Sequence, residues 1–354
     1  MTGRDGGRKA EQGAGRPTVR DVAREAGVSL ATVDRVLNER PGVRKVTAKR
    51  VADAMARLGY QRDMAAANLS KRRHYRMAFL LAEGTNSFMH MLRDAVGNTA
   101  SFTSMDRIDL RTVLVPPFDG PALAAALDAL DPEEIDGVAV VATDSPEVRD
   151  AIARLSARGV YVLTLVSDAP TSMRARFVGI DNVVAGRTAA GLLGRFCPAP
   201  GRICIVMGSA LLRDHVERRL GFETVIAREY PHLSCLPPIE GRDDAETVGR
   251  LLSAQLKAEP GIAGIYNLGA GNRGIVRALE ERAAGPRIPV VVHELTPYAR
   301  SALISGVFDA VINQDAGHEI RSAVRILKAL IDGRPTFDAQ ESICIDIYMR
   351  DNLP

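Results

Sequence analysis

From Arg76 onward, short apolar runs alternate with longer stretches of helical periodicity, and this alternation constrains the fold more than any other feature of the chain. The runs indicate strands buried on both faces of a sheet, and they lie at 77–82, 110–115, 138–142, 160–166, 203–208, 264–266 and 289–293. The helical stretches between them include 121–130, 145–158, 183–196, 214–229, 244–258 and 271–283. The pattern predicts an α/β core of doubly wound parallel sheets in two lobes. A ligand cleft is then expected where the carboxyl ends of both lobes' strands face each other.

The first 73 residues carry a charge that the rest of the chain does not share. They hold 17 Lys and Arg against 8 Asp and Glu, a net charge of +9, whereas the remainder has a net charge of −6. A basic segment on a mildly acidic body favours contact of that segment alone with a polyanion such as DNA. From charge alone, a solvated basic tail is an equal alternative.

The pattern within residues 17–61 predicts three helices. Thr18 followed by Asp21 resembles a capping box, Gly27 suits the left-handed end of a helix, and Ser29 suits the N-cap of the next. The second helix is expected at 30–38 and the third from near residue 47, ending at Gly59. Two short helices joined by a glycine turn and braced by a third predict a helix-turn-helix, although the apolar positions alone fit any small helical bundle.

The exact string is more specific. Residues 18–29 (TVRDVAREAGVS), 31–38 (ATVDRVLN) and 47–60, ending in ARLGY, resemble the start of lactose-repressor (LacI/GalR) family regulators. The resemblance implies that 30–38 is a recognition helix in the DNA major groove, with Leu30, Ala31 and Arg35 at bases and Ser29 and Thr32 nearer phosphates. The full set of expected DNA-binding residues is Thr18, Ser29, Leu30, Ala31, Thr32, Asp34, Arg35, Asn38 and Leu69.

Asp34 departs from the family pattern, which usually has Ser at this place. A carboxylate there is repelled by DNA phosphates unless it pairs with Arg35 or Arg20, or accepts a hydrogen bond from a cytosine amine. We favour the pairing within the protein. This position leaves the operator sequence open.

Residues 62–75 are expected to be a hinge helix or linker, and the Gly-rich residues 1–16 a disordered arm. The segment 62–75 is Ala-rich but too short to be a stable helix alone. In the family, the equivalent segment becomes helical on DNA, and a Leu from each subunit of a dimer enters the minor groove; Leu69 lies at that position here. A plain interdomain linker is the alternative.

Landmarks across 76–354 resemble the periplasmic-binding-protein-like core of the same regulators. They are NSF (86–88), IDGV (135–138), GIDN (179–182), RRLGF (218–222) and INQD (312–315). The stretch YNLGAGN (266–272) and the pair HE (293–294) indicate a ribose-type core. The first lobe is expected at about 76–180 and 312–335, and the second at about 181–311 and 336–354. The effector-binding candidates are Asn86, Phe88, Asp144, Asp168, Arg218, Asn267, Asn272, Glu294 and Gln314.

Each candidate also has a structural explanation. Arg218 matches the family's ligand-binding Arg, whose planar fork suits vicinal hydroxyls or a carboxylate, but a generic helix Arg would merely be solvated. Gln314 and Asn267 follow strands, where an amide can bind a hydroxyl or stabilise a turn. His215 and His293 are either ligand contacts or core histidines.

The leading prediction is an allosteric repressor of sugar or polyol metabolism genes, controlled by a sugar, polyol or sugar acid in the cleft. We expect a homodimer in the cytoplasm that binds double-stranded operator DNA, with no membrane contact, cofactor or metal. The four Cys are scattered and no apolar run reaches the length of a membrane span. The GAG of 269–271 lacks the ending of a phosphate-binding loop. One alternative is a helix-turn-helix fused to a sugar-modifying enzyme, which is disfavoured because the sequence shows no catalytic set of residues. The other is a sugar-binding protein for transport, which the basic charge of the first 73 residues disfavours.

Overall fold

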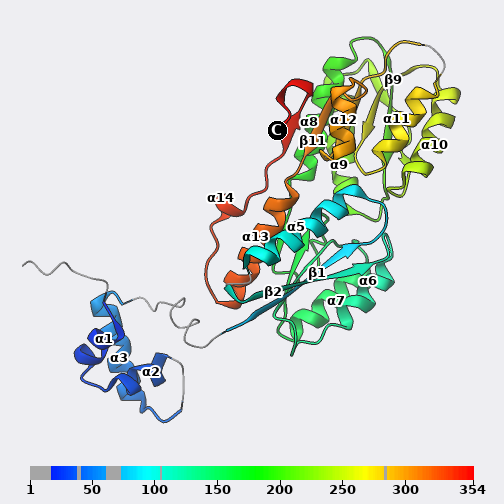
Figure 1. Cartoon of the computed structure of the whole chain (residues 1–354). Helices are drawn as coiled ribbons and strands as arrows, with labels where there is room; N and C mark the ends of the chain where they lie inside the picture. Colours follow the sequence, from blue (N-terminus) through cyan, green and yellow to red (C-terminus); the bar gives the residue numbers. More distant parts are fainter. Residues whose placement is uncertain (1–16, 38–40, 61–72, 104–105, 283–284) are drawn as a thin grey trace, which may run out of the picture. The chain divides into compact units, whose positions relative to one another are not determined.

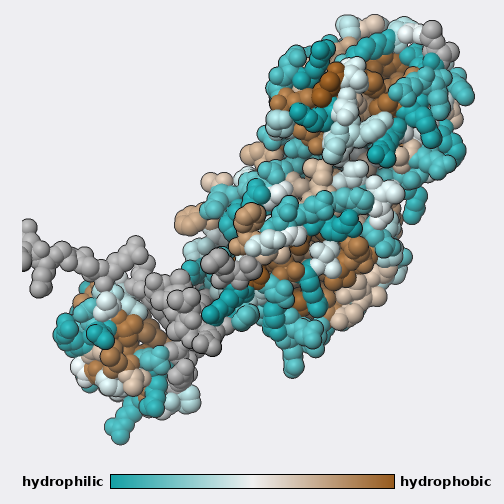
Figure 2. All heavy atoms as spheres, in the orientation of Figure 1, coloured by the Kyte–Doolittle hydropathy of each residue, from teal (hydrophilic) through white to brown (hydrophobic). Residues whose placement is uncertain are grey.

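The computed structural model describes residues 17–37, 41–60, 73–103, 106–282 and 285–354 (Figure 1). The chain divides into two units, Met1–Arg73 and His74–Pro354. On the face in view in Figure 2, hydrophilic side chains surround apolar ones in both units. Within the described ranges, no helix has the length and apolar character needed to cross a membrane.

The small unit consists of the helices α1 (Val19–Ala26), α2 (Leu30–Leu37) and α3 (Lys45–Leu58). The backbone N–H and the hydroxyl of Thr18 both donate to the Asp21 carboxylate, at 2.9 and 2.7 Å, which fixes the start of α1. Gly27, at φ 59°, ends α1 in the left-handed conformation, as the sequence predicts. Ser29 Oγ then accepts from the Thr32 backbone N–H at 3.2 Å and caps α2.

A small apolar core holds these three helices together. Its buried members are Val22, Ala23, Ala26, Val33, Val51 and Ala54. Met55 and Leu58 of α3 are half-buried and pack against this core. Arg50 of α3 also donates to the Ala26 carbonyl at 2.6 Å, so a side chain satisfies the open end of α1.

The first lobe of the large unit is built on a five-stranded, fully parallel sheet of order β2-β1-β3-β4-β5. Its strands are β1 (Tyr75–Ala82), β2 (Ile108–Val115), β3 (Gly137–Val140), β4 (Tyr161–Leu165) and β5 (Arg176–Val178). The helices of this lobe are α5 (Ser87–Thr103), α6 (Gly120–Asp128), α7 (Pro146–Ala157) and α13 (Ala316–Ile331).

Helices cover both faces of this sheet, which explains the uninterrupted apolar run of β1. Met77, Phe79 and Leu81 belong to the core that includes residues of α5 and α13. Ala78 and Leu80 point to the opposite core, with residues of α6 and α7. Successive side chains of β1 alternate between two buried faces, so a polar residue would be buried in an apolar core on either face of this strand.

The second lobe repeats this plan on a seven-stranded sheet of order β12-β11-β10-β9-β6-β7, with β8 also paired to β6. Its strands are β6 (Gly201–Met207), β7 (Leu233–Cys235), β8 (Ile239–Glu240), β9 (Ile262–Asn267), β10 (Val290–His293), β11 (Ala310–Asn313) and β12 (Asp346–Tyr348). All described pairs are parallel except β11 with β12. Its helices are α8 (Asn182–Phe196), α9 (Arg213–Glu229), α10 (Ala245–Ala258), α11 (Asn272–Glu280) and α12 (Pro297–Ile304). The short helices α14 (Asp338–Glu341) and a 3₁₀ turn at Arg350–Asn352 complete the carboxyl-terminal part.

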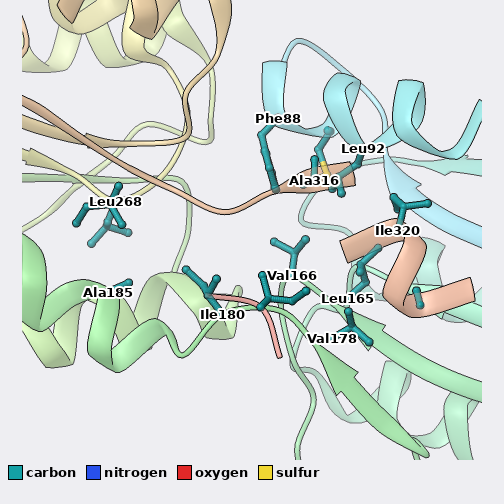
Figure 3. Close-up of a cluster of buried hydrophobic side chains, with 14 of the residues drawn as sticks. Phe88, Leu92, Leu165, Val166, Val178, Ile180, Ala185, Leu268, Ala316 and Ile320 are labelled. Atoms are coloured by element: carbon teal, nitrogen blue, oxygen red, sulfur yellow. The ribbon is translucent and has the colours of Figure 1, made fainter. Parts of the chain in front are cut away.

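The chain passes between the two sheets three times: from β5 to α8, from β11 to α13, and from α14 to β12. One apolar cluster continues through these crossings, with Phe88 and Leu92 of α5, Ile180 before α8, and Ala316 and Ile320 of α13 (Figure 3). The two lobes therefore share a buried core at the crossings, and the carboxyl ends of their strands face a common space.

Candidate functional site

In the small unit, the exposed face of α2 gathers the three residues expected to contact bases, Leu30, Ala31 and Arg35, together with Asp34. Leu30, Ala31, Asp34 and Arg35 are all exposed, whereas Val33 on the opposite side is fully buried. Leu30 keeps 47% of its surface exposed although it is a large apolar residue. Positions i, i+1, i+4 and i+5 lie on one face of a helix, so the four side chains form one surface.

The other expected DNA-binding residues divide into two groups. Ser29 and Thr32 lie at the start of α2, where their hydroxyl oxygens are 2.9 Å apart, and Thr18 lies at the start of α1. Asn38 and Leu69 lie outside the described residues, as do the expected arm at 1–16 and most of the hinge at 62–75.

In the large unit, a cavity of about 810 Å³ lies between the two lobes. The first lobe lines it with residues that follow β1, β3 and β4, including Asn86, Phe88, Val141 and Ser167. The second lobe lines it with residues of α9 and of the loops after β8, β9, β10 and β11, including Asp214, Arg218, Asp243, Asn272, Glu294 and Gln314. Each of these strands presents its carboxyl end, which is where open parallel sheets bind ligands.

Among the described residues that line the cavity, Arg218 is the only buried arginine, and it is 2% exposed. Its Nε donates to Asn182 Oδ1 at 2.8 Å, and its Nη1 donates to the Leu268 carbonyl at 3.0 Å. Its Nη2 has no hydrogen-bond partner and lies 3.6 Å from Glu294 Oε1. Two of its nitrogens thus hold the guanidinium in place, and the third is left with unused hydrogen-bond donors.

The place of Arg218 depends on close contact between α8 and α9. A Cβ on Gly186 of α8 would lie 1.9 Å from the Arg218 carbonyl oxygen, and one on Gly221 would lie 2.2 Å from the Val183 carbonyl oxygen. Phe222, the last residue of the RRLGF segment, stacks on Tyr266 with ring centroids 4.5 Å apart. Glycine and aromatic positions of this segment therefore serve to position the arginine.

Glu294 faces Arg218 and is almost fully buried. Gln314 donates to it twice, from Nε2 at 2.8 Å and from its backbone N–H at 3.3 Å. Burial raises the pKa of Glu294 to about 7, an increase that the Arg218 charge and the Gln314 hydrogen bonds oppose. This carboxyl group therefore exchanges its proton near neutral pH.

Glu319 of α13 is fully buried behind the same cluster, and neither of its carboxylate oxygens has a hydrogen-bond partner. Burial raises its pKa well above the ordinary value, and the nearby Glu294 charge acts in the same direction. The protonated, neutral form of Glu319 is the one that such a site favours.

His293 is a buried, neutral member of the cavity wall. Burial lowers the pKa of His293 well below the ordinary value, and the positive charge of Arg218 lowers it further. Its Nε2 is 2.8 Å from the Tyr266 hydroxyl, whereas its Nδ1 has no hydrogen-bond partner. His293 is thus both a core residue and a lining residue, two roles that the sequence could not separate.

Six of the nine effector-binding candidates line the cavity: Asn86, Phe88, Arg218, Asn272, Glu294 and Gln314. Asn267 is fully buried behind it and donates to Asn272 Oδ1 at 2.7 Å, so it orients a lining residue. Asp144 and Asp168 are not among the lining residues. Asp144 pairs with Arg149 at 2.9 Å, and Asp168 accepts from Arg174 Nη2 at 2.7 Å.

Several lining residues were not candidates in the sequence. Asp214, at the start of α9, is 4% exposed and its Oδ1 has no hydrogen-bond partner. Asp243 accepts from Asn86 Nδ2 of the other lobe at 3.0 Å and from the Ala270 backbone N–H at 2.9 Å. Its neighbour in the cavity, Ser167, accepts from the Arg213 backbone N–H at 3.1 Å, again between lobes. Asp243 was missed because β8, the strand that it follows, is too short to recognise in the sequence, whereas Ser167 follows the predicted strand β4 and its position could have marked it.

Three lining residues other than glycine hold an unusual backbone conformation. Val166 has φ 64°, Asp243 has φ 55° and Glu294 has φ 67°, in the left-handed region that β-branched residues in particular avoid. Strain of this kind persists where the surrounding structure holds the residue in place, and it is frequent at binding sites. In the described residues, no group of three or more His, Cys, Asp or Glu is placed to hold a metal ion.

Comparisons with known proteins match both units. Residues 78–335 match the family described as periplasmic binding protein domain, and residues 18–63 match the family described as bacterial regulatory proteins, lacI family. The chain is 45% identical to the HTH-type transcriptional regulator RegA of Clostridium saccharobutylicum over 71 residues, 20% of this chain and 21% of that protein.

A longer match reaches into the large unit. The chain is 27% identical to catabolite control protein A of Streptococcus mutans over 186 residues, which are 50% of this chain and 51% of that protein. The matches thus span about a fifth to a half of these two relatives. Among solved structures, a solute-binding protein of an ABC transporter from Burkholderia graminis, in complex with D-arabinose, has a TM-score of 0.72 at 21% identity. That match covers 78% of this chain and 96% of the solved one, and it shows the fold.

Proposed function

Because the chain belongs to the periplasmic binding protein domain family and carries the helix-turn-helix domain of the lacI family of bacterial regulatory proteins, we propose that it is a DNA-binding transcriptional regulator controlled by a small molecule. The observation that carries this proposal is the presence in one chain of an exposed recognition face on α2 and a cavity lined by two lobes. A protein that binds both DNA and a metabolite can couple the two equilibria.

The proposed DNA contacts follow from the chemistry of the α2 face. Arg35 can donate two parallel hydrogen bonds to a guanine, and Leu30 or Ala31 can contact a thymine methyl group. Ser29, Thr32 and Thr18 have hydroxyls suited to phosphate oxygens. We assign Asn38 and Leu69 to the same interface through their place in the motif, with Leu69 entering the minor groove from the hinge.

The polar atoms without partners in the cavity indicate the class of effector. They are Nη2 of Arg218, Oδ1 of Asp214, Oε1 of Gln314 and Nδ1 of His293. A hydroxyl group both donates and accepts, so neighbouring hydroxyls of one ligand can satisfy this mixture of donor and acceptors. An unpartnered buried polar atom costs about 1–3 kcal/mol, which binding of such a ligand would remove.

The charge of the lining favours a neutral ligand. Its acidic residues are Asp214, Asp243, Asp244, Glu246, Glu280 and Glu294, against Arg218, Arg273 and Arg277. A sugar acid or sugar phosphate would bring a further negative charge into this set. We therefore propose a neutral sugar or polyol, a choice supported by the bound D-arabinose of the similar solute-binding protein.

The names of two relatives support a role in regulating genes of sugar use. These relatives are catabolite control protein A and, at 44% identity over 75 residues, the ribose operon repressor of Bacillus subtilis. We propose a repressor that acts in the cytoplasm as a homodimer on a pseudo-palindromic operator. The enzyme alternative has no support in the relatives, since those named here are transcriptional regulators or repressors.

The experiment that tests this function is selection of double-stranded DNA from a random pool by the full-length protein, followed by binding measurements on the selected sequence. We expect a pseudo-palindromic site that binds at least a thousandfold tighter than random DNA, in the ordinary range for specific binding. Binding that falls with salt but is indifferent to sequence would overturn the proposal.

A further inference from the structure

A second cavity of about 260 Å³ lies beside the first. We call it the apolar annex and define it by six of its lining residues: Ala82, Val115, Pro117, Phe118, Leu123 and Thr143. They come from the end of β1, the end of β2 with the loop after it, α6, and the loop after β3. The annex therefore lies at the carboxyl edge of the first lobe's sheet.

The annex adjoins the large cavity. Asn86, Met89, Val141, Leu212 and Asp243 line both spaces. The hydrogen bond of 3.0 Å from Asn86 to Asp243 joins the lobes at this shared boundary. A ligand held by Arg218 and Gln314 in the large cavity could thus extend one substituent past this bond into the annex.

The buried wall of the annex is apolar. Val115 and Leu123 are buried, together with Met89. Of its charged lining residues, Glu83, Asp119 and Arg242 are exposed, whereas Asp243 and Asp244, which also line the large cavity, are half-buried. An enclosed apolar cavity of about 150 Å³ in a protein can bind benzene, so the volume of the annex, about 260 Å³, is sufficient for a ring. A charged group would lose its hydration there without gaining a buried partner.

One residue in the wall of the annex has a side-chain oxygen without a hydrogen-bond partner. Thr143 lines the annex, is 5% exposed, and its hydroxyl makes no hydrogen bond. A buried hydroxyl without a partner is rare in folded proteins and is costly. The annex thus presents an apolar wall and one hydrogen-bonding position.

We propose that the annex is a second part of the effector site and binds an uncharged, ring-sized apolar substituent that carries one hydrogen-bonding group. The effector is then a polyhydroxylated compound with an apolar substituent, such as an aryl glycoside, rather than a simple sugar. This inference rests on the proposed function for the polar half of the ligand, while the annex itself is testable without it.

The first test uses phenol and toluene as probes of the annex in the full-length protein, with binding measured by saturation-transfer NMR. Ala82→Leu adds three carbons to the annex, and Ala125→Leu adds the same atoms to an exposed position of α6 as a control. We expect phenol to bind the wild type and Ala125→Leu but not Ala82→Leu. Absent phenol binding in the wild type, or equal binding in all three proteins, would overturn the proposal.

Thr143→Val provides a second variant that preserves shape and removes only the unpartnered hydroxyl. Because toluene cannot use the hydroxyl, the ratio of phenol to toluene affinity should fall about threefold or more in Thr143→Val. An unchanged ratio would contradict the assignment of Thr143, whether or not Ala82→Leu folds.

The second test compares methyl and phenyl β-D-galactopyranoside, and the matching glucopyranosides, by calorimetry. For a sugar that binds, we expect the phenyl glycoside to bind at least about tenfold tighter than the methyl glycoside, a difference of 1.4 kcal/mol. Equal affinities would overturn the annex proposal and leave the proposed function standing. If phenol binds the annex but neither these glycosides nor free sugars bind, the annex is supported and the sugar effector is contradicted.

Discussion

Nη2 of Arg218 lies 3.6 Å from Oε1 of Glu294, within ion-pair distance, and makes no hydrogen bond to any described group. The two side chains come from α9 and from the end of β10, and both are nearly buried. A ligand hydroxyl that accepts from Arg218 and donates to the unpartnered Asp214 oxygen would complete this arrangement. The first two predictions follow from this pair.

Arg218→Lys should weaken binding of the sugar that most raises the melting temperature of the wild type by tenfold or more. Lysine keeps the charge but cannot reproduce the planar fork, and a hydrogen bond to a charged group contributes about 1.5–3 kcal/mol. Titration calorimetry measures the change. Arg219→Lys is the matched control, because Arg219 is half-buried at the next position and pairs with Glu223 at 2.7 Å. Equal losses in the two variants would remove Arg218 from the site.

Glu294 should make the protein less stable as the pH rises from about 4.5 to 7. Its pKa is raised from 4.5 to about 7, so the folded state holds a proton in this range that the unfolded state has released. By conversion the cost at pH 8 is on the order of 3 kcal/mol.

Glu294→Gln removes this effect. Its melting temperature should exceed that of the wild type at pH 8, and the gap should close toward pH 5 and stay constant above pH 7. Glu319→Gln is an informative comparison, because burial raises the pKa of Glu319 well above its ordinary value and the gap for that variant should also widen as the pH rises. A gap for Glu294→Gln that is the same at pH 5 and pH 8 would contradict the raised pKa.

Gly186→Ala should destabilise the large unit and displace Arg218. The added Cβ would lie 1.9 Å from the Arg218 carbonyl oxygen, so α8 and α9 must separate. We expect a loss of about 1–3 kcal/mol in the free energy of unfolding, measured by urea denaturation, together with weaker sugar binding. Gly97→Ala is the control: Gly97 lies within α5, and a Cβ there meets no atom within 4 Å. That variant should be unchanged or up to about 1 kcal/mol more stable.

Arg35→Ala should lower affinity for the selected operator by about 1–3 kcal/mol, the range for one bidentate contact to a base. Affinity for random DNA should change much less, because phosphate contacts dominate that binding. Fluorescence anisotropy at fixed salt measures both. Arg57→Ala is the comparison, since Arg57 lies on α3 and donates to Glu25 at 3.0 Å. A parallel loss on operator and random DNA would assign Arg35 to phosphate contact only.

The sequence predicted the fold where periodicity is strong. The apolar run of β1 is visible because helices bury both faces of the sheet, and the same holds for β6 and β10. The strands β7 and β8 were not predicted, because three and two residues carry no recognisable pattern. In the small unit, the capping residues Thr18 and Ser29 and the turn residue Gly27 marked the helix ends, since their chemistry is local.

The site was predictable in part, for a related reason. Arg218, Glu294 and Gln314 follow recognisable strands or lie in a recognisable helix, and all three line the cavity. Asp168 also follows a strand, but its carboxylate accepts a hydrogen bond from Arg174 of the following loop, and Asp168 does not line the cavity. Asp243 lies in a loop and has φ 55°, a backbone conformation that no local sequence pattern predicts. Such long-range partners and loop conformations depend on the folded chain and cannot be read from spacing.

The most direct test of the central claim is operator affinity measured with and without saturating sugar, in the wild type and in Arg218→Lys. If a ligand in the cavity of the large unit controls the operator affinity of the small unit, sugar should change the wild-type Kd for the operator by roughly 5- to 150-fold. In Arg218→Lys the same sugar concentration should change it far less. A wild-type Kd that stays the same at every sugar concentration that saturates the cavity would contradict the account.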